Sequence, residues 1–148
     1  MWIGGSSKAA VRRTVRFGTG WQGGIDTPET AGRVVAEIKT ALAAAGRTID
    51  EDHYGIGFPF RFGRVDDHPE IAATMKAYAA YGGIDAQAYF AIGDAGTILA
   101  RIMDYIEAGI SKFILRPMGV GDDDLMTQTA RLIAEVLPAV PKRVGAAG

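Results

Sequence analysis

The sequence predicts an α/β fold of about four parallel strands with flanking helices. Short apolar segments alternate with longer segments whose apolar residues recur at helical spacing, which is typical of βαβ units and a parallel sheet. Twenty glycines are spread along the chain, at the ends of these segments where turns need them. At 148 residues the chain is long enough for one domain with its own core. From the residues alone two architectures stay open: half of a (β/α)8 TIM barrel, or a small open α/β sheet.

The first two strands are short, and each ends in a glycine-rich turn. Residues 2–4 form the first, and a helix is expected from 7 to 17 because its apolar positions fall on one side. The second strand covers 18–22 and ends at the Gly23-Gly24 pair. A core strand with no lead-in also suggests that the chain starts in the middle of a larger fold.

The second helix carries the clearest start and stop signals. Thr27 suits the N-cap and Pro28 the first helical position. Apolar residues then keep helical spacing until Gly46 supplies the stop. A third strand follows at 53–63, where large apolar residues alternate with smaller or polar ones.

The rest of the chain indicates two further units. The last helix contains the apolar residues Leu125, Leu132, Ile133 and Val136 and is stopped by Pro138. The expected elements are a helix at 69–81, an extended lead-in rather than a strand at 89–93, a helix from 94 to 109, a strand at 112–116 broken by Pro117, and a helix at 122–138.

Composition excludes several classes of function. A formal net charge of -1, with 22% charged residues, favours neither nucleic acid nor an anionic membrane surface as a partner. No run approaches the roughly 18 apolar residues of a membrane span, and no signal peptide is recognisable. The chain has no cysteine, which excludes disulfides and thiolate chemistry. We therefore expect a cytoplasmic protein.

The turn Gly4-Gly5-Ser6-Ser7 is the main candidate for a binding site. It joins a strand to a helix, and bare N–H groups at a helix N-terminus favour a phosphate or another anion. Glycine allows close approach, and the serine hydroxyls can bond phosphate oxygens. The alternative is an ordinary tight turn in which Ser6 or Ser7 caps the helix.

Other candidates stand at strand ends, where barrel enzymes place their chemistry. Trp21 and Gln22 end the second strand, and Gln22 can hydrogen-bond the edge of a ring. Arg61 and Arg116 end the third and fourth strands and can hold a phosphate or carboxylate, or else form ion pairs. Alternation with Ile114 would aim Arg116 into the barrel mouth.

Metal and acid–base chemistry find little support in the sequence. The two histidines, His53 and His68, have no partner at metal-ligand spacing, so no metal is expected. The acids at 122–124 suit the first turn of a helix, where the helix dipole favours them. No catalytic acid or base stands out.

Three stretches together resemble the C-terminal half of the luciferase-like monooxygenases, a superfamily of flavin- and deazaflavin-dependent oxidoreductases. They are Trp-Ile-Gly-Gly-Ser-Ser with Ala9-Ala10, Gly-Thr-Gly-Trp at 18–21, and the segment 108–117. Their order looks like the fifth, sixth and eighth strands of that family's barrel, with 54–62 as the seventh. The resemblance implies half of a (β/α)8 barrel over 1–140, followed by a flexible tail at 141–148.

The resemblance also implies a function. The cofactor would be the deazaflavin coenzyme F-420 or FMN, bound by Gly4, Gly5, Ser6, Ser7, Trp21 and Gln22, with substrate or anion contacts from Arg61 and Arg116. The reaction would be hydride transfer or oxygenation of a small organic substrate. The sequence lacks the family's first four strands, which supply much of the pocket around the ring. We therefore expect a fragment or half-length relative that forms a homodimer or associates with a missing N-terminal half.

Two other functions stay open at this point. The chain can be a non-catalytic half-barrel, a truncated remnant that self-associates because its sheet edges and one sheet face are uncovered. It can also be a small phosphate-binding α/β protein, and a reversal of strand order would favour that open sheet.

Overall fold

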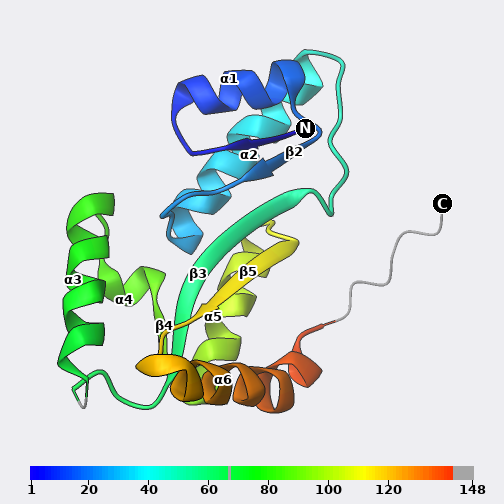
Figure 1. Cartoon of the computed structure of the whole chain (residues 1–148). Coiled ribbons are helices and arrows are strands. Elements are labelled where there is room, and N and C mark those ends of the chain that lie inside the picture. The colour runs from blue at the N-terminus through cyan, green and yellow to red at the C-terminus, as the bar shows by residue number, and fades with distance from the viewer. Residues whose placement is uncertain (67, 142–148) are drawn as a thin grey trace.

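The computed structural model describes residues 1–66 and 68–141 (Figure 1). One sheet runs through the molecule, with helices between successive strands. The elements are β1 (Trp2–Gly4), α1 (Lys8–Phe17), β2 (Gly20–Gln22), α2 (Pro28–Ala44), β3 (Tyr54–Phe62), α3 (Pro69–Gly82), α4 (Ala86–Tyr89), β4 (Ala91–Gly93), α5 (Ala95–Glu107), β5 (Lys112–Pro117), α6 (Gly121–Arg131), η1 (Leu132–Val136) and η2 (Leu137–Ala139).

The strand order confirms the predicted half-barrel. All pairs are parallel, and β1, β2 and β3 are neighbours in chain order. Gly55 of β3 pairs with both β2 and β5, so those strands lie on opposite edges of β3. Phe60 pairs with both β4 and β5, so the short β4 shares the edge of β2. The path β1-β2-β3-β5 therefore follows the chain without the reversal that an open sheet would show.

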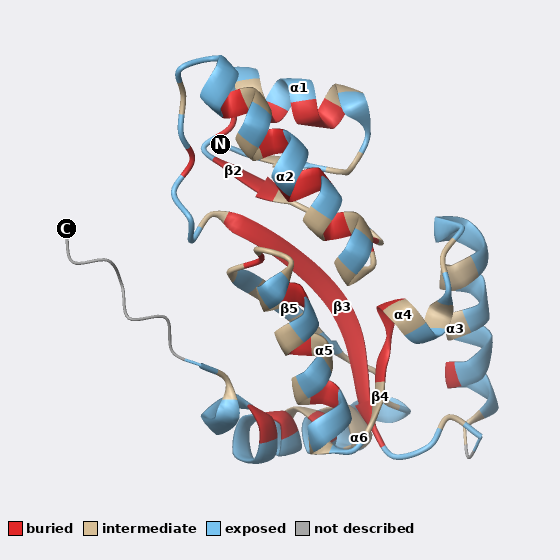
Figure 2. Cartoon of the chain, turned by 180° about the vertical axis from the view of Figure 1, so that it is seen from behind, coloured by how far each residue is buried: buried red, intermediate tan, exposed pale blue. Residues whose placement is uncertain are grey.

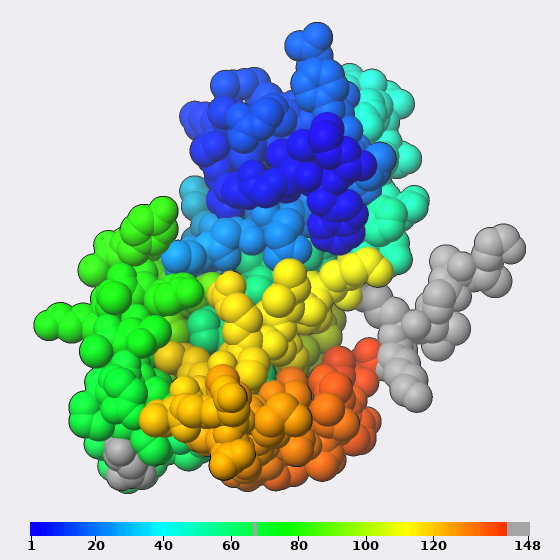
Figure 3. Space-filling model, viewed as in Figure 1, coloured from blue at the N-terminus to red at the C-terminus, as the bar shows by residue number. Residues whose placement is uncertain are grey.

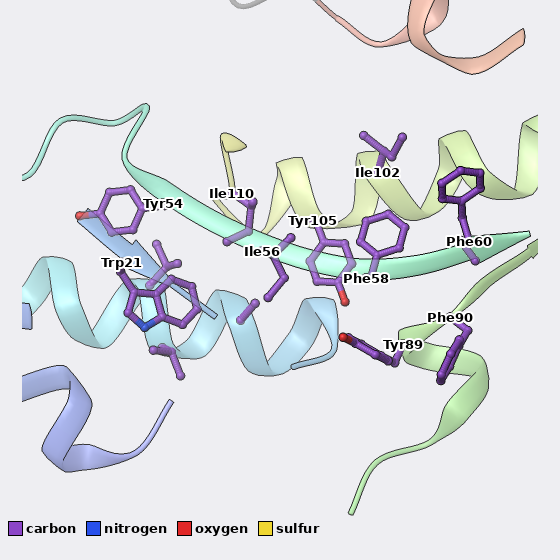
Figure 4. Packing of buried hydrophobic residues seen from close by; sticks show 14 of the residues in the cluster. Trp21, Tyr54, Ile56, Phe58, Phe60, Tyr89, Phe90, Ile102, Tyr105 and Ile110 are labelled. Carbon is purple, nitrogen blue, oxygen red and sulfur yellow. The ribbon is translucent and has the colours of Figure 1, made fainter. Parts of the chain in front are cut away.

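The long strand β3 divides the molecule into two faces, because successive side chains point to opposite sides. Its glycines and Arg61 lie on one face, and its large apolar residues lie on the other, where Tyr105 of α5 stacks on Phe58 at 5.1 Å between ring centroids (Figure 4). β3 is buried along its whole length (Figure 2). The core residues of β3 are Tyr54, Ile56, Phe58, Phe60 and Phe62.

One expectation about the C-terminal part was wrong. The segment 89–93, predicted as an extended lead-in, begins at the last residue of α4 and contains the strand β4, because Ala91–Gly93 pairs with the far end of β3. In the last predicted helix Leu132 and Val136 are buried, whereas Ile133 is 58% exposed. A π-helical turn, η1, follows α6 directly and rotates the side chains after Arg131 relative to a regular α-helix.

Two remaining points concern the predicted tail and the possibility of a membrane-spanning helix. Of the tail predicted at 141–148, only Pro141 belongs to the described residues. Within the described ranges, no helix combines the length and the apolar character needed to cross a bilayer.

Candidate functional site

The turn after β1 lies at the carboxyl end of the sheet, beside the turn after β2. Gly4 pairs with Gln22 in the ladder, and the Gly5 N–H donates to the Gln22 carbonyl oxygen at 3.0 Å. Gly5 has a φ of +93°, a left-handed conformation that a side chain would strain. The turn is therefore a fixed continuation of the sheet at the rim where barrel enzymes bind their ligands.

The two serines of this turn form different hydrogen bonds. Ser7 is the N-cap of α1, and its Oγ accepts the Ala10 N–H at 3.2 Å. The Ser6 hydroxyl donates to the Asp26 carboxylate at 2.5 Å, and the same carboxylate oxygen accepts the Gly24 N–H at 2.8 Å. Buried Asp26 thus ties the turn after β1 to the turn after β2. The sequence analysis did not identify Asp26 as a site residue, because nothing in the local pattern predicts this contact.

Backbone donors of the turn are still available for a ligand. Among the described residues, the N–H groups of Ser6 and Ser7 have no hydrogen-bond acceptor. They belong to the loop that precedes α1, and exposed Lys8 adds a positive charge there. The negative charge of the Asp26 carboxylate repels an anion. The attraction from the two N–H groups and from Lys8 must therefore exceed this repulsion.

Trp21 lies behind the turn and away from solvent. It is fully buried in the core, and its indole N–H donates to the Gly5 carbonyl at 2.9 Å. The next residue, Gln22, points to the opposite face, where its Oε1 lies over Gly55. The structure therefore separates two residues that the sequence placed in one cofactor site.

Gln22 and Arg116 meet in an open pocket of about 380 Å³ on the glycine-rich face of the sheet. That face is toward the viewer in the space-filling view (Figure 3). Gly57 leaves its floor without a side chain. The pocket is lined by Gln22, Gly23, Gly24, Ile25, Gly57, Tyr78, Tyr89, Ile114 and Arg116.

A tyrosine that the sequence did not single out completes this pocket. The Tyr89 hydroxyl donates to the Gly57 carbonyl at 2.9 Å and accepts from Arg116 Nη2 at 2.6 Å. Burial raises the pKa of the Tyr89 hydroxyl, while the neighbouring guanidinium of Arg116 acts in the opposite direction. Arg116 is itself exposed, so Tyr89 orients a charge that is open to the pocket.

Arg61 lies elsewhere, in an internal ion pair. It is 5% exposed, and its Nη1 donates to the Asp124 carboxylate and to the Met118 carbonyl, each at 2.7 Å. Its Nε is buried and has no partner among the described residues. Hydrogen bonds from the Val120 N–H and from Arg61 lower the pKa of Asp124 to about 2. The contact fixes the loop between β5 and α6.

A second group of polar residues lies at the opposite end of the sheet. The group consists of Asp50, Asp52 and His53, which come directly before β3. One carboxylate oxygen from each aspartate and one ring nitrogen of the histidine, the atoms that could bind a metal ion, lie within 4.8 Å of one another. Asp52 pairs with Lys112 at 3.2 Å, and His53 Nδ1 lies 2.8 Å from the Thr19 carbonyl. These contacts link the starts of β2, β3 and β5, and none of these residues lines the pocket.

Comparison with known proteins finds relatives by structure and none by sequence. No protein-family model matches the chain, and no curated protein matches its sequence. An F-420-dependent secondary alcohol dehydrogenase, solved with an F-420-acetone adduct, is similar with a TM-score of 0.70 at 14% identity, over 95% of this chain and 48% of that one.

Two further solved structures are similar to this chain over about half of their own length. The coenzyme F-420 dependent tetrahydromethanopterin reductase from Methanopyrus kandleri has a TM-score of 0.62 at 18% identity, over 93% of this chain and 50% of that one. The oxygenating constituent of 3,6-diketocamphane monooxygenase from Pseudomonas putida, in complex with FMN, has a TM-score of 0.65 at 13% identity, over 95% and 48%. This chain spans about half the length of the structures it matches. It has the fold of the luciferase-like monooxygenases in about half the length of their barrel, as the sequence resemblance indicated.

Proposed function

We propose that the chain is part of a luciferase-like oxidoreductase that binds coenzyme F-420 or FMN through the Gly4–Ser7 turn. The observation that carries this proposal is the pair of unoccupied N–H donors of Ser6 and Ser7, at the start of α1 on the carboxyl rim. The likeness of fold supports it, since two of the three neighbours described above are named for F-420 and the third holds FMN.

The residues of this chain contact the cofactor at two places, the turn after β1 and the pocket on the glycine-rich face. The N–H groups of Ser6 and Ser7, together with Lys8, hold the cofactor phosphate, while Trp21 and Asp26 keep the turn in position. Gln22 faces the pocket with an amide that can bond the edge of a ring. When bound, the cofactor supplies the hydride-transfer or oxygenation chemistry.

The pocket beside the turn suits a small organic substrate with an anionic group. Arg116 presents an exposed guanidinium, oriented by Tyr89, and Ile25, Tyr78 and Ile114 supply apolar surface. Arg61 does not contact the substrate. Its ion pair with Asp124 holds the loop between β5 and α6 in position. The remaining walls of the pocket come from a second half-barrel, and we place the assembled protein in the cytoplasm.

Titration of the purified chain with FMN, riboflavin and coenzyme F-420, followed by cofactor fluorescence, tests the proposal. FMN should bind more tightly than riboflavin, which lacks the phosphate. Lys8→Ala should weaken FMN about two- to fivefold without changing riboflavin, because only the phosphate meets that charge. Lys76→Ala, an exposed lysine on α3, is the matched control. Equal binding of FMN and riboflavin, or none of the three at high micromolar concentration, would refute the proposal.

A non-catalytic half-barrel is the second candidate. It is favoured by the match to only about half of each neighbour, since the family's pocket needs strands from the other half. A chain that self-associates but binds none of these cofactors would support this candidate over the first.

A further inference from the structure

The helix after the first strand carries a strongly basic exposed face. Lys8, Arg12, Arg13 and Arg16 are all exposed on α1, and the helix contains no acidic residue. Phe17 at its end is also exposed. The opposite face of α1 packs on the sheet and on α2. An edge helix of a half-barrel thus presents four positive charges that no acid of its own balances.

The helix after the last strand carries the opposite charge. Asp122 and Asp123 are exposed in the first turn of α6. Farther along, Met126, Ile133 and Leu137 are 69%, 58% and 45% exposed. Met126 lies on α6, whereas Ile133 and Leu137 follow in η1 and η2, so all three are exposed apolar side chains of one continuous helical segment.

These two helices stand at corresponding places on the two edges of the sheet. Three residues separate β1 from α1, and three separate β5 from α6, so both helices start at the same rim. Figure 1 shows α1 and α6 at opposite ends of the sheet, running back along it in the same direction. Within the described part of the chain, β1 pairs only with β2 and β5 only with β3.

We propose that a second copy of this chain closes the half-barrel, with α1 of each copy packed beside α6 of the other. A twofold axis along the barrel would bring β5 of one copy beside β1 of its partner, and the strands would stay parallel. In this arrangement the acidic first turn of α6, with Asp122 and Asp123, would face the basic side of α1, which carries Arg12 and Arg13. A second copy fits better than an unrelated partner because this chain carries both complementary surfaces.

Both helices also carry exposed apolar side chains that the same interface would cover. They are Phe17 on α1, and Met126, Ile133 and Leu137 on α6 and the turns that follow it. The dimer would therefore cover the exposed side chains that a lone copy leaves in water. This inference goes beyond the proposed function and needs no bound cofactor, so the two can fail separately.

Sedimentation or light scattering of the chain at micromolar concentration gives the first test. The expected result is a particle of twice the chain mass whose dissociation increases with salt, because the charge pairs are screened. A monomer at these concentrations overturns the proposal.

Two charge-reversed variants test the arrangement itself. Arg12→Glu with Arg13→Glu, or Asp122→Arg with Asp123→Arg, should each weaken self-association roughly tenfold or more through like-charge repulsion. A mixture of the two variants should form a heterodimer, since both of its interfaces then pair opposite charges. These four residues are exposed, so far-ultraviolet circular dichroism should show an unchanged fold.

The matched control is Arg33→Glu with Lys76→Glu, which changes the net charge equally on α2 and α3. It should leave the dimer intact. A dimer that tolerates both edge variants, or two variants that stay monomeric when mixed, overturns the arrangement.

Discussion

At the scale of residues, the candidate site depends on side chains that bond backbone groups of other elements. The indole of Trp21 holds the Gly5 carbonyl, and the Asp26 carboxylate holds both Ser6 and the Gly24 N–H. Tyr89 similarly holds the Gly57 carbonyl beneath the pocket. These contacts fix the donors and the exposed guanidinium before a ligand arrives, which reduces the entropy lost on binding.

The ion pair of Arg61 with Asp124 gives a pH-dependent prediction. Asp124→Asn should destabilise the protein at pH 7 by about 1–3 kcal/mol, because it removes the counter-charge of a buried guanidinium. The folded pKa of about 2 lies below the ordinary 3.8, so the carboxylate contributes fully above 3.8 and loses its contribution as the pH falls toward 2. The stability difference between the two proteins should shrink over that range.

Urea unfolding of both proteins at several pH values measures this difference. Asp123→Asn, an exposed neighbour in the same helical turn, should show almost no effect. A difference for Asp124→Asn that stays constant down to pH 2 would contradict the assigned role.

The sequence identified some of these residues and not others. Strand-end position marked Gln22 and Arg116, and the structure brings them into one pocket. It also marked Arg61, but that guanidinium is paired with the partly exposed carboxylate of Asp124, sixty-three residues farther along the chain. Asp26 and Tyr89 were missed because their partners are distant backbone carbonyl, N–H or side-chain groups, and no local pattern encodes such contacts.

At the scale of elements, Ser7 links the stability of α1 to the geometry of the turn. Ser7→Ala should lower the free energy of unfolding by about 1 kcal/mol, since the Ala10 N–H loses its acceptor. Ser7→Gly should cost only a few tenths of a kcal/mol, because glycine is itself tolerated at this position. Equal losses from both changes, measured by urea unfolding, would argue against a capping role.

Elements with strong local signals were predicted well. Thr27 and Pro28 do open α2, and the alternation of large residues gave β3. The strand β4 was misjudged because three residues carry little periodicity, and its pairing with the far end of β3 decides its state. The exposure of Ile133 follows from a π-helical turn, which a regular 3.6-residue spacing does not anticipate.

At the scale of the whole molecule, the alternation of strands and helices sufficed to predict a parallel sheet, whereas the half-barrel order of its strands was implied by the family resemblance. What it could not predict is how the glycine-rich face is covered, since that depends on groups outside one copy. Uncovered edges at β1 and β5, with oppositely charged helices beside them, are the physical basis for expecting a second half.

The Gly4–Ser7 turn is the centre of the proposed chemistry, and its amide signals report on it most directly. In a ¹⁵N-labelled chain titrated with FMN and separately with riboflavin, the largest shifts with FMN should fall on Gly5, Ser6, Ser7 and Lys8. Riboflavin should leave these signals nearly in place. Equal shifts with both ligands, or shifts concentrated away from this turn, would contradict phosphate binding at the start of α1.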